Sequence, residues 1–488
     1  MTDARGAESV TKTYDLIVIG AGPVGENVAD YATKRGLSTV IVESELVGGE
    51  CSYWACTPSK AILRPVLARD SALRVEGAKE SITAPIDSAA VLRRRDSFVH
   101  DWSDQGQVDW LDSAGIDLVR GHGRITGVKK VTVTAPDGSE IELEARAAVT
   151  IATGSAALLP DIPGLLDVDP WTSREATGAK EVPASLAIIG GGVVAAEMAT
   201  AYTGLGSEVT LIVRGTLLEK MEPFAGELVA EQLEKSGATL KSGSSPTSAR
   251  RGDDGLVVLE FDDGSTVTAA EVLVATGRTP RTEDLGLGSI GLTNGDWLQV
   301  DDTLLVTAPT NDDEKWLYAT GDVNHRALLT HQGKYQARAA GEVIAARAQG
   351  RPVDDAPWGL HVATADAEAV PQVTFTDPEV ASIGHTEKTA TDAGYPVRVV
   401  DYDIGSVAGA ALQADGYAGK ARLIVDTDRD VILGATFVGQ DVADLLHSAT
   451  IAVVGEVPLR RLWHAVPSYP TISEIWLRLL ETYGRPES

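Results

Sequence analysis

Cysteine is scarce in this chain of 488 residues, which contains only Cys51 and Cys56. A protein of this length with no other thiol does not use cysteine as a scattered core hydrophobe. In a reducing compartment a lone pair indicates catalysis before structure, so we expect a redox-active dithiol. A structural disulfide and two inert buried thiols are the alternatives. No metal site is expected, because no further cysteine or nearby histidine completes a ligand set.

Long apolar runs and positive charge are also scarce. No run approaches the roughly 20 residues of a membrane span, and Met1 to Thr13 lacks the apolar stretch of a secretory signal. The 42 basic residues face 70 acidic ones, a formal net charge of −28. This balance disfavours nucleic acid and anionic membranes as partners. We expect a cytoplasmic globular protein of about three domains, with the acidic residues as solvated surface.

Glycine is plentiful and forms a first dinucleotide-binding pattern. Its parts are the predicted strand 14–19, Gly20, Gly22 and Gly25, the predicted helix 26–36, the predicted strand 38–42, and Glu43. In such a pattern the three glycines serve a tight turn, close approach to a pyrophosphate, and helix–strand packing. The helix N-terminus favours the anion, and the terminal acid accepts hydrogen bonds from a ribose. The sequence therefore predicts a nucleotide site here.

The same pattern returns near the middle of the chain. Its parts are the predicted strand 185–189, Gly190, Gly192 and Ala195, a predicted helix, and the predicted strand 208–213. Two such patterns imply two nucleotides and electron transfer between them. Arg214 stands where an acid would bind a free ribose hydroxyl, and Lys220 follows. Cations here favour the 2′-phosphate of NADPH, although Arg214 as a plain surface residue is the alternative.

Together these motifs resemble the class I pyridine nucleotide–disulfide oxidoreductases over nearly the whole chain. The resemblance also rests on segment 48–60, which contains both cysteines, and on segments 152–155 and 275–278, which are similar to the family's crossover strands. Segment 318–323 is similar to its flavin-binding segment, and segment 373–384 is similar to the start of its dimerisation domain. The resemblance implies FAD at the first site, NADPH at the second, and a homodimer. Its implied electron path runs from nicotinamide to flavin to the Cys51–Cys56 disulfide.

The resemblance also assigns roles to individual residues. Cys56 matches the thiol nearest the flavin, and Cys51 matches the thiol that attacks substrate. Lys60 and Glu197 match an ion pair beside the flavin, although Lys60 alone could be a surface residue. The further matches are Glu43, Gly49, Thr153, Gly154, Gly321 and Asp322 for FAD, and Gly277 for NADPH. A helix beginning at Cys56 is expected to lower a thiol pKa.

The chain departs from the family near its C-terminus. Disulfide-reducing members carry a His-Pro-Thr-x-x-Glu segment whose histidine transfers protons. Here Tyr469 occupies the histidine position, while Glu474 is retained. A phenol titrates near pH ~10 and is a poor base for forming a thiolate. His464 could substitute only if its loop folded back, so a packing or surface role is preferred. A Tyr in this segment also resembles mercuric reductase, but the second cysteine pair of that enzyme is missing.

We therefore expect an α/β fold with two doubly wound dinucleotide-binding domains and a C-terminal α+β dimerisation domain. The expected bounds are 1–156 and 284–358 for the FAD domain, 157–283 for the NADPH domain and 359–488 for dimerisation. The leading hypothesis is an FAD-dependent NADPH oxidoreductase for a small non-glutathione acceptor, such as a quinone or a metal ion. A disulfide reductase using Tyr469 or water, and a flavin-based redox sensor, are the alternatives.

Overall fold

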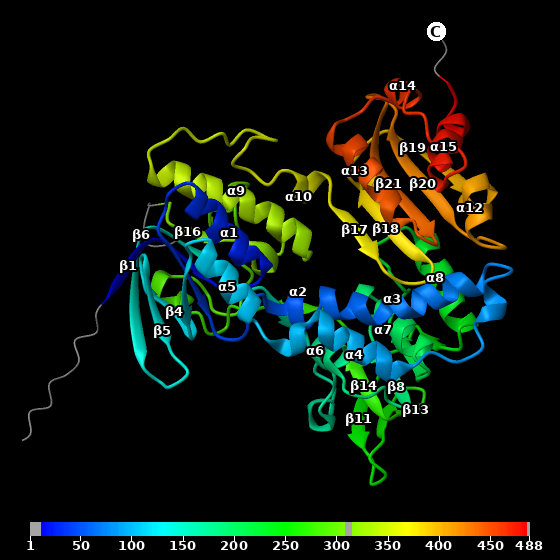
Figure 1. The fold of residues 1–488 in the computed structure, drawn as a ribbon, viewed down its shortest axis with the longest axis horizontal. Coiled ribbons are helices and arrows are strands. Elements are labelled where there is room, and N and C mark those ends of the chain that lie inside the picture. Colours follow the sequence, from blue (N-terminus) through cyan, green and yellow to red (C-terminus); the bar gives the residue numbers. More distant parts are fainter. Residues whose placement is uncertain (1–10, 308–314, 486–488) are drawn as a thin grey trace, which may run out of the picture. The chain divides into compact units, whose positions relative to one another are not determined.

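The computed structural model describes residues 11–307 and 315–485 (Figure 1). Most of the N-terminal segment on which the expected lack of a secretory signal rests lies outside these residues. The chain divides into two compact units, Met1–Thr57 with Val99–Ala156 and Arg278–Ala367, and Pro58–Phe98 with Ala157–Gly277 and Glu368–Ser488. This division does not separate the second from the third expected domain, so the three-domain bounds stay a prediction. Within the described part of the chain, no helix is long and apolar enough to cross a membrane.

The first unit is built on a seven-stranded sheet. In spatial order its path is β3 (Asp117–Arg120), β2 (Thr39–Glu43), β1 (Lys12–Ile19), β6 (Glu140–Ile151), β5 (Lys130–Thr134) and β4 (His122–Gly127), and β16 (Leu317–Ala319) also pairs with β6. Strands β1, β2, β3, β6 and β16 run parallel, whereas β4 and β5 form antiparallel ladders. The predicted strand–helix–strand order is confirmed, with α1 (Pro23–Lys34) between β1 and β2. The helix α1 begins at Pro23, earlier than the expected residue 26, because proline suits the first helical turn.

Both faces of this sheet are buried at the end of β1, which explains the apolar run at residues 16–19. Leu16 and Val18 pack in one hydrophobic cluster, while Ile17 and Ile19 pack in another. The first cluster includes residues of α1 and of α9 (Thr330–Ala348), which lie side by side (Figure 1). Further helices of this unit are α2 (Gly49–Tyr53), α5 (Gln105–Ser113), η2 (His100–Trp102), η4 (Leu287–Ile290), η5 (Gly321–Asn324) and α10 (Ala365–Glu368). A small sheet pairs β7 (Ser155–Ala157) with β15 (Arg278–Pro280).

The second unit contains a four-stranded parallel sheet that repeats the first pattern. Its order is β10 (Thr239–Ser242), β9 (Glu208–Val213), β8 (Ser185–Ile189) and β14 (Glu271–Val274). The helix α7 (Val193–Gly204) connects β8 to β9, as predicted, and packs in one core with α8 (Pro223–Lys235). A three-stranded antiparallel sheet is formed by β11 (Ser248–Arg251), β12 (Val257–Glu260) and β13 (Thr266–Ala269).

The same unit carries a five-stranded antiparallel sheet. Its order is β17 (Pro371–Thr374), β18 (Glu379–Gly384), β21 (Val431–Gly439), β20 (Lys420–Asp426) and β19 (Val397–Asp403). The other helices of the unit are α3 (Cys56–Leu73), α4 (Ser88–Phe98), α6 (Ser173–Gly178), α11 (Glu387–Asp392), α12 (Ala408–Gln413), α13 (Leu446–Val454), α14 (Leu459–Leu462) and α15 (Ile475–Tyr483), with the 3-10 turns η1 (Lys79–Ser81), η3 (Leu166–Val168), η6 (Ile404–Ser406), η7 (Ala443–Leu445) and η8 (Ile472–Glu474). The fold is thus α/β with a C-terminal α+β part, as predicted.

Candidate functional site

The N-terminus of α1 has the geometry of a phosphate cradle. Gly22 is the N-cap and has no side chain with which to cap the N–H groups of the first turn. A Cβ built at Gly22 meets nothing within 4 Å. A Cβ at Gly25 would instead overlap the Gly20 carbonyl oxygen, and Gly20 itself has φ +104°. The three glycines therefore do what the pattern requires: turn, open approach and close packing.

Two further residues border this cradle. Gly49 has φ +56°, and a Cβ there would lie 2.7 Å from the Gly22 Cα, so the chain crosses closely over the glycine turn. Glu43, at the end of β2, accepts hydrogen bonds from the backbone N–H groups of Ala21 and Glu45, both at 2.7 Å. Burial raises the pKa of the Glu43 carboxyl. The arrangement fits a bound dinucleotide, with an open glycine, free helix N–H groups and a carboxylate close by.

The 3-10 turn η5 carries the predicted Gly321 and Asp322. Gly321 has φ +77°, and a Cβ there would be 3.1 Å from the Val24 side chain of α1. The Asp322 carboxylate accepts from the Ser155 hydroxyl at 2.5 Å, and that hydroxyl accepts in turn from Arg278. η5 therefore begins against the start of α1 and is tied through Asp322 to β7.

Thr153 and Gly154 are engaged with the backbone of Arg281. The Thr153 hydroxyl donates to the Arg281 carbonyl at 2.8 Å, and the Gly154 carbonyl accepts from the Arg281 N–H at 3.1 Å. The Arg281 guanidinium donates to the Glu50 carboxylate at 2.7 Å, next to Cys51 in the chain. These contacts hold the segment after β6 beside α2.

The two cysteines are not joined in a disulfide in this structure, and both are only partly exposed. Cys51 lies in α2, and Cys56 is the first residue of α3, as predicted. The Cys56 Sγ is 3.3 Å from the hydroxyl of Thr330, at the start of α9. The hydrogen bond to Cys56, together with burial, raises the pKa of the Cys51 thiol. The lowering expected from the helix start concerns Cys56 and stays a prediction.

Lys60 lies one turn after Cys56 on α3, and its ammonium is 2.7 Å from the Glu197 carboxylate of α7. The Glu197 side chain is 4% exposed and the Lys60 side chain 37%. The second Glu197 oxygen accepts from the Phe375 N–H at 3.0 Å, and the ammonium lies over the Phe375 ring, 4.8 Å from its centroid. The predicted pair is thus formed, and the aromatic ring orients the lysine as well.

The second glycine pattern repeats the first. Gly190 has φ +141°, and a Cβ there would overlap the Ala275 carbonyl oxygen, whereas a Cβ at Gly192 meets nothing within 4 Å. Ala195 is fully buried in α7. Arg214 and Lys220 are exposed beyond β9, and Gly277, with φ +155°, is exposed beyond β14. The residues present fit a second dinucleotide, and the two cations follow the strand β9 of the same pattern.

In the described part of the C-terminal segment, Tyr469 and Glu474 differ in exposure and partners. Tyr469 is 76% exposed, whereas Glu474 is 7% exposed and bonds to Arg478 one turn later. The other Glu474 oxygen is buried and has no hydrogen-bond partner among the described residues. His464 is exposed. Within the ranges 11–307 and 315–485, no group of three or more His, Cys, Asp or Glu is placed to hold a metal ion.

Sequence reasoning missed three polar residues near these groups. Thr330 contacts Cys56 across 274 positions of sequence, which no spacing rule could reveal. Glu26 follows the third glycine and is buried on α1, where burial raises its pKa to about 8. Gln336 accepts from the Gly321 N–H at 2.7 Å. Glu26 is the polar exception among the buried residues of α1, which was the available signal for it. The buried face of α9 also carries Gln332 and Glu342, so Gln336 gave no such signal.

Comparison with known proteins agrees with this geometry. Residues 14–350 match the model of the pyridine nucleotide-disulphide oxidoreductases, and residues 370–479 match that family's dimerisation domain. The chain is 32% identical to the dihydrolipoyl dehydrogenase of Chlorobaculum tepidum over 480 residues, 96% of each chain. It is 32% identical to the mercuric reductase of Streptomyces lividans over 478 residues, again 96% of each chain.

A solved structure shares the fold at low sequence identity. It is the Cu(II) complex of the HOCl-induced flavoprotein disulfide reductase RclA from Escherichia coli, with a TM-score of 0.81 and 21% identity. The similarity covers 96% of this chain and 99% of that one. With two glycine cradles, a dithiol at a helix start and a dimerisation domain in order, the chain belongs to the pyridine nucleotide-disulphide oxidoreductases.

Proposed function

We propose that the protein is an NADPH-dependent FAD oxidoreductase that reduces a small acceptor other than glutathione disulfide, of the quinone or metal-ion kind. One observation supports the choice of acceptor above the others. Tyr469, which matches the family's histidine in the sequence, is exposed, and Glu474 bonds to Arg478. A disulfide with a basic leaving thiol needs a proton-transfer group, whereas a quinone or a metal ion does not.

FAD would be held by the first cradle. Gly22 and the first turn of α1 would face its pyrophosphate, Glu43 its ribose, and Asp322 the chain between pyrophosphate and flavin. When bound, FAD supplies the two-electron chemistry that links a nicotinamide to a thiol pair. The role of Lys60 is to place a positive charge one turn after Cys56. Glu197 and the Phe375 ring fix the position of that ammonium.

The thiols have distinct proton states in this proposal. The hydrogen bond to Cys56 and burial raise the pKa of the Cys51 thiol. Cys56 is then the thiol that carries the negative charge in the reduced pair. It lies at the first residue of α3, where the helix N-terminus favours a thiolate, and the Thr330 hydroxyl is within hydrogen-bonding distance.

A homodimer is part of the proposal. The family's dimerisation domain matches residues 370–479. Large apolar side chains of this part are exposed in the single chain, namely Leu412, Ile451, Val454 and Val466. Such side chains are typical of a surface that a partner covers. The exposed Tyr469 belongs to the same part of the chain and would face the second subunit.

Arg214→Ala is expected to weaken the binding of NADPH but not that of NADH. A hydrogen bond between two charged groups contributes about 1.5 to 3 kcal/mol, so the KM for NADPH should rise about 10- to 150-fold. The KM for NADH should change little, because NADH lacks the 2′-phosphate. Arg250→Ala, another exposed arginine of the same unit, is the control. Equal effects on both nucleotides would contradict NADPH as the donor.

Tyr469→His is expected to create activity toward glutathione disulfide. An imidazole titrates near neutral pH, and general acid–base catalysis contributes about 100-fold or more. The rise should follow a pH profile with an apparent pKa close to that of histidine. Tyr469→Phe is the control and should not gain this activity. No gain in the histidine variant would mean that this position does not meet the thiols.

The first assay is NADPH oxidation with separate acceptors: a quinone, mercuric and cupric ions, and glutathione disulfide. Turnover with a quinone or a metal ion, and little with glutathione disulfide, is the expected result. Rapid turnover of glutathione disulfide by the native protein would contradict the proposal. It would support the second candidate, a disulfide reductase, which the retained thiol pair and its Thr330 contact favour.

A further inference from the structure

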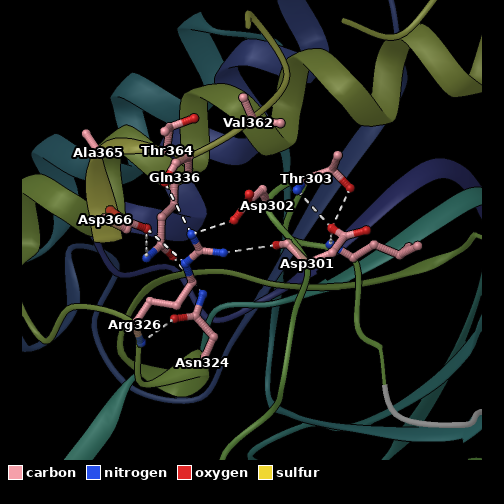
Figure 2. A network of polar contacts seen from close by, with 12 residues as sticks. Asp301, Asp302, Thr303, Asn324, Arg326, Gln336, Val362, Thr364, Ala365 and Asp366 are labelled. Carbon is pink, nitrogen blue, oxygen red and sulfur yellow. Dashed lines mark hydrogen bonds and ion pairs between the residues drawn. The ribbon is translucent and has the colours of Figure 1, made fainter. Parts of the chain in front are cut away.

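A buried carboxylate, that of Asp366, is linked through Gln336 to the turn η5, which carries Asp322. Asp366, in α10, has a side chain with 0% exposure. Its two oxygens accept from the side-chain amides of two α9 residues, Gln332 at 2.9 Å and Gln336 at 2.8 Å. The guanidinium of Arg326 lies 3.5 Å away and also bonds to Asp302 and to the Asp301 carbonyl (Figure 2).

This carboxylate decides which way the Gln336 amide faces. An ionised carboxyl only accepts hydrogen bonds, so Gln336 must present its NH₂ group to Asp366. The amide oxygen is then directed away from Asp366. It accepts from the Gly321 N–H at 2.7 Å and from the Asn324 amide at 2.8 Å. With the amide reversed, its NH₂ group would face both of these donors.

Both partners of the Gln336 oxygen belong to η5. Gly321 is its first residue and Asn324 its last, and Asp322 lies between them. The Asn324 amide also donates to the Ala319 carbonyl, at the end of β16, at 3.1 Å. A single buried oxygen therefore ties both ends of the turn, and the turn leaves the Asp322 carboxylate against Ser155.

We propose that Asp366 is a positioning residue for FAD: it sets the direction of the Gln336 amide and, through it, the geometry of the turn that holds Asp322. This inference rests on the FAD site of the proposed function. On this inference, FAD binding depends on the match of hydrogen-bond donors and acceptors between Asp366 and Gln336, and not on the size of these side chains. The exposed Asp302 shares Arg326 but does not contact Gln336, so it has no part in this role.

The charge state of Asp366 supports the assignment. Burial raises the pKa of its carboxyl to about 6, and the bonds from Gln336 and Gln332 and the Arg326 charge act against that rise. Well above this pH the group is ionised and accepts only. The measurements below are therefore made well above the pKa.

The test uses the purified holoenzyme and the FAD dissociation constant, obtained from the fluorescence of flavin released on dilution. Asp366→Asn has nearly the same shape but replaces one of the two acceptor oxygens with an NH₂ group, so it cannot accept from Gln332 and Gln336 together, and it is expected to raise that constant at least about tenfold. Asp302→Asn should change it less than about twofold. Combining Asp366→Asn with Gln336→Glu restores an acceptor facing Gly321 and Asn324. It should return the constant to within about threefold of native.

Each outcome decides the inference. Native-like FAD binding by Asp366→Asn would overturn it, and so would a double variant that binds no tighter than the single one. If the single variant does not fold, the double variant decides alone: folding with FAD bound supports the proposed role of Asp366, and failure to fold contradicts it. A native protein that holds no FAD would instead contradict the proposed function, which separates the two failures.

Discussion

Gly22→Ala is expected to yield a folded protein that no longer retains FAD. Gly22 has φ −69° and ψ 175°, which alanine adopts without strain, and its added Cβ meets nothing within 4 Å. The apoprotein should therefore keep its stability. The methyl group occupies the space through which a pyrophosphate reaches the first turn of α1. Loss of two charge-assisted hydrogen bonds there would weaken the binding of FAD at least about 100-fold.

The measurement is FAD per protomer after gel filtration, together with thermal unfolding of the apoprotein. Gly25→Ala is the matched comparison within the same pattern. Its Cβ would overlap the Gly20 carbonyl oxygen, so α1 must shift, at a cost of about 3 kcal/mol in the free energy of unfolding. Gly22→Ala should thus lose FAD while keeping its stability, whereas Gly25→Ala should lower the stability of the fold itself. A Gly22→Ala protein that binds FAD normally would show that the pyrophosphate of FAD does not lie against Gly22.

Cys51→Ser is expected to abolish reduction of a disulfide probe while sparing a quinone. The probe is an aromatic disulfide with an acidic leaving thiol, which needs no proton donor and which the native protein should reduce. Removing the attacking nucleophile should lower that activity at least about 1000-fold. A quinone accepts electrons without a covalent bond to sulfur. Its turnover should therefore stay within about threefold of native.

Both activities are measured as NADPH oxidation, and thiols are counted in the denatured protein. Ser52→Ala is the control, since Ser52 lies beside Cys51 in α2 and its hydroxyl is 3.5 Å from the Gln107 amide. It should leave both activities unchanged. If Cys51→Ser also abolished quinone turnover, electrons would reach every acceptor through the thiol pair. The acceptor would then be one that binds sulfur.

The sequence determined the parts of this protein that depend on neighbours in the chain. Strand, glycine turn and helix recur because β1 and β8 each end in a buried apolar run and because a side chain at Gly20 or Gly190 would overlap a backbone carbonyl. The start of α3 at Cys56 followed from the same local rules. The class of fold, and the presence of two dinucleotide cradles, needed no tertiary information.

Only the tertiary structure decided which distant groups meet. Thr330 reaches Cys56 across 274 positions, and Asp366 meets Gln336 because α10 and α9 pack together. The pairing of Glu474 with Arg478 is local, at one helical turn, but the burial of its second oxygen is not. Hydrogen-bond direction and burial arise where several elements pack against each other. No pattern along one element encodes them, because each element supplies only one side of the contact.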